Sequence, residues 1–179
     1  MEVREILLRV CSLLGLQEDI ISSPSSDEKT LGLLLSALNF VIYEIYDELP
    51  TYKEEKITSI DRCIPYASFS KNLCKVKKIS LDGVKKRWRR GDNGLLVDRE
   101  GEYSVIYSYT PDDVTIDDTV IFPPSINIRT VSYGVAGEYS LYVGRFEDTE
   151  AYDARFTGAL ASAKRVGIRE WHRGDSSAL

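Results

Sequence analysis

The sequence has few of the residues that form catalytic and metal sites. It contains one histidine, His172, and three cysteines, Cys11, Cys63 and Cys74, in 179 residues. The cysteines form no CxxC pair and their odd number leaves no complete disulfide framework, so we expect synthesis in a reducing compartment, the cytoplasm. The histidine lies in a basic C-terminal segment, with no serine or cysteine arrangement linked to it. The sequence therefore predicts a protein that is not an enzyme.

Long apolar runs, internal repeats and low-complexity tracts are also lacking. No apolar run approaches the roughly 18 residues that a membrane span requires. Residues 1–5 begin an amphipathic helix and not a secretory leader. The glycines at 83, 91, 94 and 101 belong to turns, and the aspartates at 112, 113, 117 and 118 lack the glycine and the spacing of a calcium loop. We therefore expect no cofactor, no metal and no membrane contact.

The composition is that of a globular protein, with 43% hydrophobic and 28% charged residues. This length fits one domain, or one helical domain that carries a small β insertion. The formal net charge of −5 argues against a surface that binds nucleic acid everywhere, so each basic segment has to be judged by itself.

Residues 1–50 have the period of α-helices. A first helix is predicted over residues 2–14, where Gly15 has the sequence of a left-handed C-cap. Ser25 and Glu28 form a candidate capping box for a second helix, which Pro50 ends. The inward stripe of the second helix consists of apolar residues at helical spacing: Leu31, Leu34, Leu35, Leu38, Val41, Ile42, Ile45 and Leu49.

The second helix also carries apolar residues on its back, where a surface helix is normally polar. These residues are Leu33, Phe40 and Tyr43. A helix that is apolar on two faces is either central in its own fold or covered by a neighbouring molecule, and the sequence favours neither alternative. If a neighbour covers it, the three residues form an oligomer interface.

Residues 51–122 change to a period of 2, which is typical of strands. Strands are predicted at 56–60, 74–81, 84–90, 95–97 and 103–109, joined by turns such as Asp82-Gly83. We expect a small antiparallel meander of about four strands. Such a sheet requires a packed face, which a helical bundle could supply.

Residues 123–179 return to a helical period. One helix is predicted to begin after Pro123 and Pro124 and to run to about Tyr142, and a second runs from about Glu147 to Val166. Small residues lie where the two backbones would approach closely, namely Gly134, Gly137, Ala159 and Ala163. The predicted fold class is therefore α+β: helices from 1–50 and 123–179 form a bundle, and 51–122 is an inserted β-rich segment.

A cluster of five cations around one tryptophan is the most prominent charged feature. Its residues are Lys85, Lys86, Arg87, Trp88, Arg89 and Arg90. One interpretation is a surface that follows phosphates and stacks a base. The other, which we favour, is a solvated hairpin arm or a protein-docking surface, because the charges would lie on both faces of a strand.

One ion pair is predicted inside the C-terminal helical hairpin. Glu138 lies at the edge of the apolar stripe of its helix, and Arg155 occupies the corresponding edge of the next helix. A pair between them would fix the helix register, whereas the alternative, which we favour, is a Glu138 side chain that reaches solvent. Either role is structural.

Three consecutive segments carry a resemblance to a known family: Tyr133-Gly-Val-Ala-Gly-Glu-Tyr139, Leu141-Tyr-Val-Gly-Arg-Phe-Glu147 and Ala151-Tyr-Asp-Ala-Arg-Phe-Thr-Gly-Ala-Leu160. They resemble the C-terminal helical hairpin of head-to-tail adaptor (connector) proteins of tailed bacteriophages. With the N-terminal helices, the similarity covers about half of the chain. The β-rich centre departs from the smallest, all-helical members of that family.

The resemblance implies a structural virion protein at the head-tail junction. Its subunits would form a cyclic homo-oligomer, typically of twelve copies, between the portal protein and the tail protein, with DNA passing through the channel. The basic C-terminal segment would dock onto the portal through Arg165, Arg169, Trp171, His172 and Arg173. The second hypothesis is a small nucleic-acid-binding module that acts through the basic residues 85–90.

Overall fold

The computed structural model describes residues 1–22 and 27–175, and the side chains of residues 1–22 and 27–165. Helices and antiparallel sheets are both present, which confirms the mixed α+β class. The chain divides into two compact units, a helical unit of residues 1–49 and 112–179 and a β unit of residues 50–111. Residues 112–122, expected in the β insertion, belong to the helical unit because Val120 N–H donates to the Met1 carbonyl oxygen at 2.9 Å.

The N-terminal helices follow the sequence pattern closely. Helix α1 (Val3–Leu14) ends at Gly15, which has the left-handed φ of 66° that the predicted C-cap requires. A short helix, α2 (Asp19–Ser22), follows, and α3 (Glu28–Glu48) begins after Asp27, whose carboxylate accepts the Thr30 N–H at 3.0 Å. Asp27 is thus the N-cap, while the predicted cap Ser25 lies outside the described residues.

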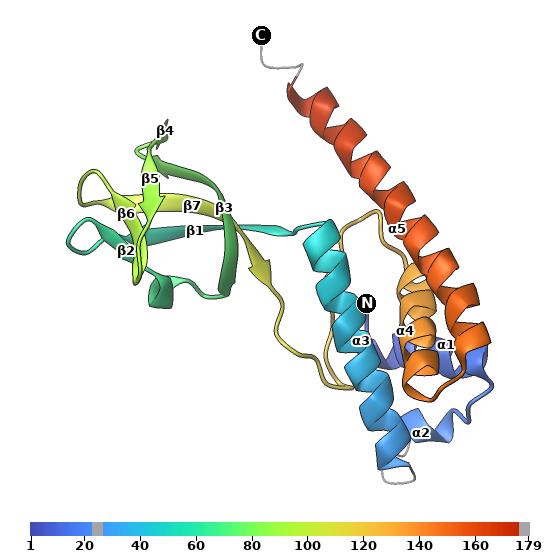
Figure 1. The fold of residues 1–179 in the computed structure, drawn as a ribbon. Coiled ribbons are helices and arrows are strands. Elements are labelled where there is room, and N and C mark those ends of the chain that lie inside the picture. The colour runs from blue at the N-terminus through green and yellow to red at the C-terminus, as the bar shows by residue number, and fades with distance from the viewer. Residues whose placement is uncertain (23–26, 176–179) are drawn as a thin grey trace. The chain divides into compact units, whose positions relative to one another are not determined.

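Helices α4 (Ile128–Tyr142) and α5 (Phe146–Asp175) form a closely packed hairpin and lie side by side in Figure 1. A Cβ atom on Gly134 would lie 2.9 Å from Val41 Cγ1 and 3.0 Å from Phe156 Cδ2, so a side chain there would collide with α3 and α5. Two boundaries differ from the prediction. Asn127 caps α4 by accepting the Thr130 N–H, and α5 continues beyond Val166.

The β unit contains seven strands among the described residues, arranged in two antiparallel sheets. The first sheet has the order β1 (Tyr52–Thr58), β7 (Glu102–Thr110), β3 (Asn72–Leu81) and β4 (Val84–Lys85). The second has the order β2 (Cys63–Pro65), β6 (Gly94–Val97) and β5 (Trp88–Arg90), and a 3₁₀ turn (Tyr66–Ser68) follows β2. The predicted hairpin at Asp82-Gly83 is present, but β7 pairs with β1 and β3, so the pairing is not that of a meander.

Strand β3 departs from the expected period of 2. Its pairing with β7 shifts between Leu73 and Lys75 and again between Val76 and Lys78. Each shift inserts one extra residue, so the apolar residues Leu73, Val76 and Ile79 recur every third position. The residues between them remain exposed, which places Lys75, Lys77 and Lys78 on the surface.

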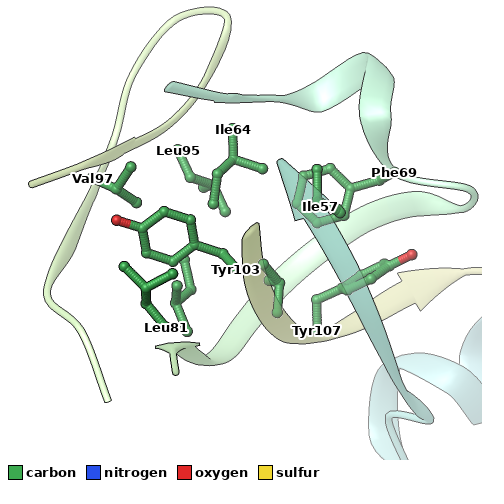
Figure 2. Close-up of a cluster of buried hydrophobic side chains, with 10 residues drawn as sticks. Ile57, Ile64, Phe69, Leu81, Leu95, Val97, Tyr103 and Tyr107 are labelled. Atoms are coloured by element: carbon green, nitrogen blue, oxygen red, sulfur yellow. The ribbon is translucent and has the colours of Figure 1, made fainter. Parts of the chain in front are cut away.

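The core of the β unit lies between its two sheets, as Figure 2 shows. Both sheets contribute side chains to it, so neither sheet depends on a helix to bury its apolar face. The buried members are Ile57, Ile64, Phe69, Ile79, Leu81, Leu95, Val97, Tyr103, Val105 and Tyr107. The ring of Phe69 meets the edge of Tyr107 at a centroid separation of 4.9 Å.

Candidate interaction surfaces

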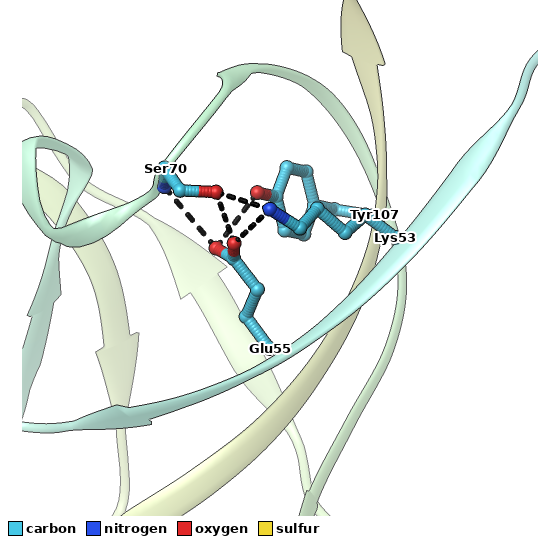
Figure 3. A network of polar contacts seen from close by, with 4 residues as sticks. All are labelled: Lys53, Glu55, Ser70 and Tyr107. Atoms are coloured by element: carbon cyan, nitrogen blue, oxygen red, sulfur yellow. Dashed lines mark hydrogen bonds and ion pairs between the residues drawn. The ribbon is translucent and has the colours of Figure 1, made fainter. Parts of the chain in front are cut away.

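A polar network at the edge of the β-unit core joins β1, β7 and the segment after the 3₁₀ turn (Figure 3). Lys53 Nζ lies 2.7 Å from Glu55 Oε1, and the Tyr107 hydroxyl donates to Glu55 Oε2 at 2.8 Å. Ser70 donates to the same carboxylate through both its backbone N–H and its hydroxyl. Glu55 thereby holds residue 70 against the sheet.

The pKa values of this network indicate a structural clamp. Partial burial by itself raises the pKa of Glu55, but the hydrogen bonds from Lys53, Ser70 and Tyr107 outweigh it and lower the pKa to about 2. Burial, and then the hydrogen bond to Glu55, raise the pKa of Tyr107 to about 12. A carboxylate that is so weakly basic is poorly suited to take a proton from Ser70, so the arrangement does not favour nucleophilic catalysis.

The basic residues 85–90 form two short strands with a connection between them. Lys85 ends β4 and Trp88 begins β5, while the Lys86 N–H donates to the Ile79 carbonyl oxygen at 2.9 Å. The predicted single strand 84–90 is therefore interrupted at Lys86 and Arg87. In a continuous strand the side chains would alternate and the cations would be divided between two faces. Because the strand is interrupted, Lys85, Lys86, Arg87 and Arg89 line one pocket together with Trp88.

Trp88 lines a surface pocket of ≈ 570 Å³. It pairs with the buried Val97 across β5 and β6 and packs partly against the core. Four cations and one acid complete most of the lining, which comprises Lys85, Lys86, Arg87, Trp88, Arg89, Leu96, Val97 and Asp98. The indole is thus fixed on one side by the core and accessible on another from a cationic pocket.

The two units differ in charge. Residues 50–111 contain 13 Lys and Arg against 8 Asp and Glu, a formal charge of +5. The remaining residues contain 10 Lys and Arg against 20 Asp and Glu, a formal charge of −10. The overall value of −5 therefore conceals a basic β unit attached to an acidic helical unit.

The back of α3 carries the predicted oligomer-interface residues. Phe40 is 50% exposed and Tyr43 is 37% exposed, while Leu33 is half-buried. The Tyr43 hydroxyl donates to the Asp113 carboxylate of its own chain, so part of this ring already has an intramolecular role. Phe40 is the residue of the three with the largest exposed apolar surface.

A second exposed apolar surface lies at the turn between α4 and α5. Its members are Leu141, Tyr142, Val143 and Phe146, with exposures of 46%, 42%, 40% and 66%. Gly144 occupies a left-handed conformation with a φ of 76°, which makes this sharp turn possible. Sequence reasoning assigned these residues to the hairpin and missed the surface, although four large apolar residues around one turn glycine were a readable signal.

The predicted pair between Glu138 and Arg155 is not formed within the described part of the chain. The Arg155 Cζ atom instead lies 5.3 Å from the centroid of the Tyr133 ring, and Tyr133 stacks on Tyr152. Glu138 interacts with the Tyr142 hydroxyl of its own helix. Arg155 therefore stabilises the hairpin through an aromatic contact.

The predicted portal-docking segment is described only in part. Arg165 is exposed on α5. The side chains of Arg169, Trp171, His172 and Arg173 lie outside the described residues. The backbone of this segment is helical up to Asp175, where the sequence had predicted a tail after Val166.

Among the residues with described side chains, no group of three or more His, Cys, Asp or Glu could hold a metal ion. By length and composition alone, α3 is apolar enough to cross a membrane, but eight of its residues are buried in the helical unit and a core helix has the same composition.

Comparisons with models of known protein families and with curated proteins find no match to this chain.

Proposed function

We propose that this chain is a subunit of the adaptor ring that joins the portal to the tail of a bacteriophage. In this proposal the terminal helices form the ring-building bundle and the β unit is an insertion into it. The subunit acts by binding its neighbours, the portal protein and the tail protein, and performs no catalysis. The ring would surround the DNA channel at the head-tail junction of the virion.

The observation that carries the proposal is the pair of separate apolar surfaces on the helical unit. One is the back of α3 with Phe40, and the other is the α4–α5 turn with Phe146. A ring closes through heterologous contacts, which require two different faces on each subunit. Contiguous exposed apolar surfaces commonly mark protein interfaces. We therefore assign the α3 face of one subunit to the α4–α5 turn of the next.

Complementary variants test this assignment. Phe40→Ser removes one face and Phe146→Ser removes the other, so each variant alone should remain monomeric in native mass spectrometry. A mixture of the two variants retains one intact interface and should form a heterodimer that cannot grow further. Because both residues are at least half exposed, the melting temperature of each monomer should match that of the unaltered chain.

Other outcomes would contradict the assignment. If Phe146→Ser alone still assembles while Phe40→Ser does not, the contact is between two α3 faces and no ring closes through the turn. If the unaltered chain stays monomeric both alone and with a portal protein, the ring proposal fails. Ile60→Ser, which removes a similarly exposed apolar side chain from the β unit, serves as the matched control and should assemble like the unaltered chain.

A second candidate function is nucleic-acid binding by the β unit. Its support is the formal charge of +5 on residues 50–111 together with the cations that surround Trp88. Cationic surfaces attract the phosphate backbone in a salt-dependent manner. This function is compatible with an adaptor ring, because the two candidates use different units of the chain.

A further inference from the structure

The pocket beside Trp88 combines three features that nucleic-acid sites share. It contains a tryptophan that the core fixes in place, apolar walls from Leu96 and Val97, and a cationic rim. Successive bases stack on aromatic side chains while cations follow the backbone in many proteins that bind single strands. An indole already held by the β-unit core loses little rotamer freedom when a base stacks on it.

The shape of the site selects among nucleic acids. In a duplex the bases are stacked and paired, so only the phosphates and the groove edges reach a protein surface. A pocket of ≈ 570 Å³ is concave and has apolar walls, which a phosphate cannot use. An unpaired base can enter it and bury its faces against Trp88 and the aliphatic wall.

We propose that the pocket around Trp88 binds an unpaired base of a single-stranded nucleic acid, with the flanking phosphates on Lys86, Arg87 and Arg89. The proposal rests on the second candidate function and assigns it a ligand class and a site. Leu96 and Val97 supply the apolar wall. Asp98 supplies an acceptor for the exocyclic amine that cytosine, adenine and guanine carry and thymine lacks.

An acidic protein surface is the competing ligand, since the helical unit of a second copy has a formal charge of −10. Such a surface would satisfy the cations, but it would leave the pocket walls and Trp88 without a planar partner. The aromatic wall therefore favours a base.

Tryptophan fluorescence provides a direct test in the full-length chain. Trp171→Phe leaves Trp88 as the only tryptophan, because the sequence contains two. Titration with single-stranded oligonucleotides of about 20 nucleotides, DNA and RNA, should quench Trp88, whereas the matching DNA duplex should not. We expect binding of the single strand to be roughly tenfold tighter than that of the duplex, and oligo(dC) to bind more tightly than oligo(dT).

Substitutions separate stacking from charge. Trp88→Leu should weaken single-strand binding roughly tenfold and leave the salt dependence unchanged, while Trp88→Phe should restore most of the affinity. Arg89→Ser should reduce the slope of affinity against salt concentration. Lys56→Ser is the matched control, because it removes one exposed cation from β1, at the opposite edge of the four-stranded sheet from β4.

Several results would overturn the inference. Equal affinities for single strand and duplex, or binding without any change in Trp88 emission, would show that no base enters the pocket. Salt-dependent association of the chain with itself, but not with nucleic acid, would assign the pocket to an acidic protein surface. The native mass of Trp88→Leu is measured in parallel, and its assembly should match that of the unaltered chain. Loss of nucleic-acid binding with unchanged assembly therefore shows that base binding and ring formation are separate properties. A failure of the base-binding proposal then does not count against the ring proposal.

Discussion

Glu55 shows how a single carboxylate can join three segments that are distant in sequence. It accepts hydrogen bonds from Lys53, Ser70 and Tyr107, and its side chain is 15% exposed. The Tyr107 ring lies in the β-unit core, so the network connects the surface to the core. Because the pKa of Glu55 is lowered, the ionised carboxylate stabilises the folded state.

The replacement Glu55→Gln should reveal this linkage through its pH dependence. The folded pKa of about 2 lies below the value of 4.5 for an unperturbed glutamate, so the stabilisation is complete above pH 4.5 and is lost as the pH falls toward 2. At pH 7 we expect the free energy of unfolding of the variant to be about 2 kcal/mol lower than that of the unaltered chain. Denaturant unfolding at several pH values measures the difference, which should shrink toward zero near pH 2.

The neighbouring Glu54→Gln provides the control for that measurement. Glu54 is exposed and accepts a hydrogen bond from the Ser104 hydroxyl, so its loss should cost less than about 0.5 kcal/mol at every pH. A Glu55→Gln deficit that stays constant between pH 2 and 7 would show that packing, and not the charge of the carboxylate, is responsible.

At the scale of helices, small residues set how closely α4 approaches its neighbours. Gly134 faces both Val41 of α3 and Phe156 of α5. Gly32 of α3 has no neighbouring atom within 4 Å of an added Cβ. Substitution by alanine should therefore change the stability of the chain in opposite directions at the two positions.

We expect Gly134→Ala to destabilise the chain and Gly32→Ala to stabilise it. The added methyl at position 134 overlaps packed side chains and should cost about 1–3 kcal/mol. At position 32 the alanine gains helix propensity, up to about 1 kcal/mol. Thermal unfolding of both variants checks the signs, and a neutral or stabilising Gly134→Ala would show that α3 and α5 can move apart at little cost.

The sequence predicted the helices better than the sheets for a physical reason. Helix periodicity and caps are local, so α1 with Gly15 and the close contact at Gly134 could be read directly. Strand pairing depends on distant residues, and β7 inserts between β1 and β3. The bulges in β3 changed the spacing of Leu73, Val76 and Ile79 to three, a spacing that by itself does not indicate a strand.

For the candidate sites, too, the sequence predicted local features and missed those that depend on residues distant in sequence. The cations around Trp88 and the apolar back of α3 were visible in the sequence, because charge and hydrophobicity are properties of single residues. The pocket was not, since it requires Leu96 and Val97 of β6 to lie beside β5. The ion pair of Glu138 and Arg155, the less favoured alternative, is not formed among the described residues, because a helical wheel places side chains by direction alone and does not show the competing Tyr133 ring.

At the scale of the whole chain, charge is divided between the two units. A basic β unit and an acidic helical unit give one chain two kinds of surface, of which the first attracts polyanions and the second repels them. In the proposed ring, the helical unit would provide the subunit contacts and the β unit would be available for nucleic acid. The C-terminal part of α5 interrupts this pattern with the basic residues 165–173.

That basic C-terminal part is the proposed portal-docking element, and truncation after Gly167 tests it. The buried side chains that the structure describes on α5 are those of Phe156, Leu160 and Ala163, all of which the truncation retains. We therefore expect an unchanged melting temperature and ring assembly. Attachment to heads that contain the cognate portal protein should be lost, because tryptophan and arginine side chains contribute most of the binding energy in many interfaces.

Cosedimentation with portal-containing heads measures attachment, and Trp171→Ala in the full-length chain serves as the less disruptive variant. If both variants still attach with undiminished affinity, docking does not use this segment. If the truncated chain instead melts at a lower temperature, residues beyond Gly167 contribute to the helical core. Loss of attachment in Trp171→Ala at an unchanged melting temperature would separate the two roles, because one side chain would then act on the portal and not on the fold.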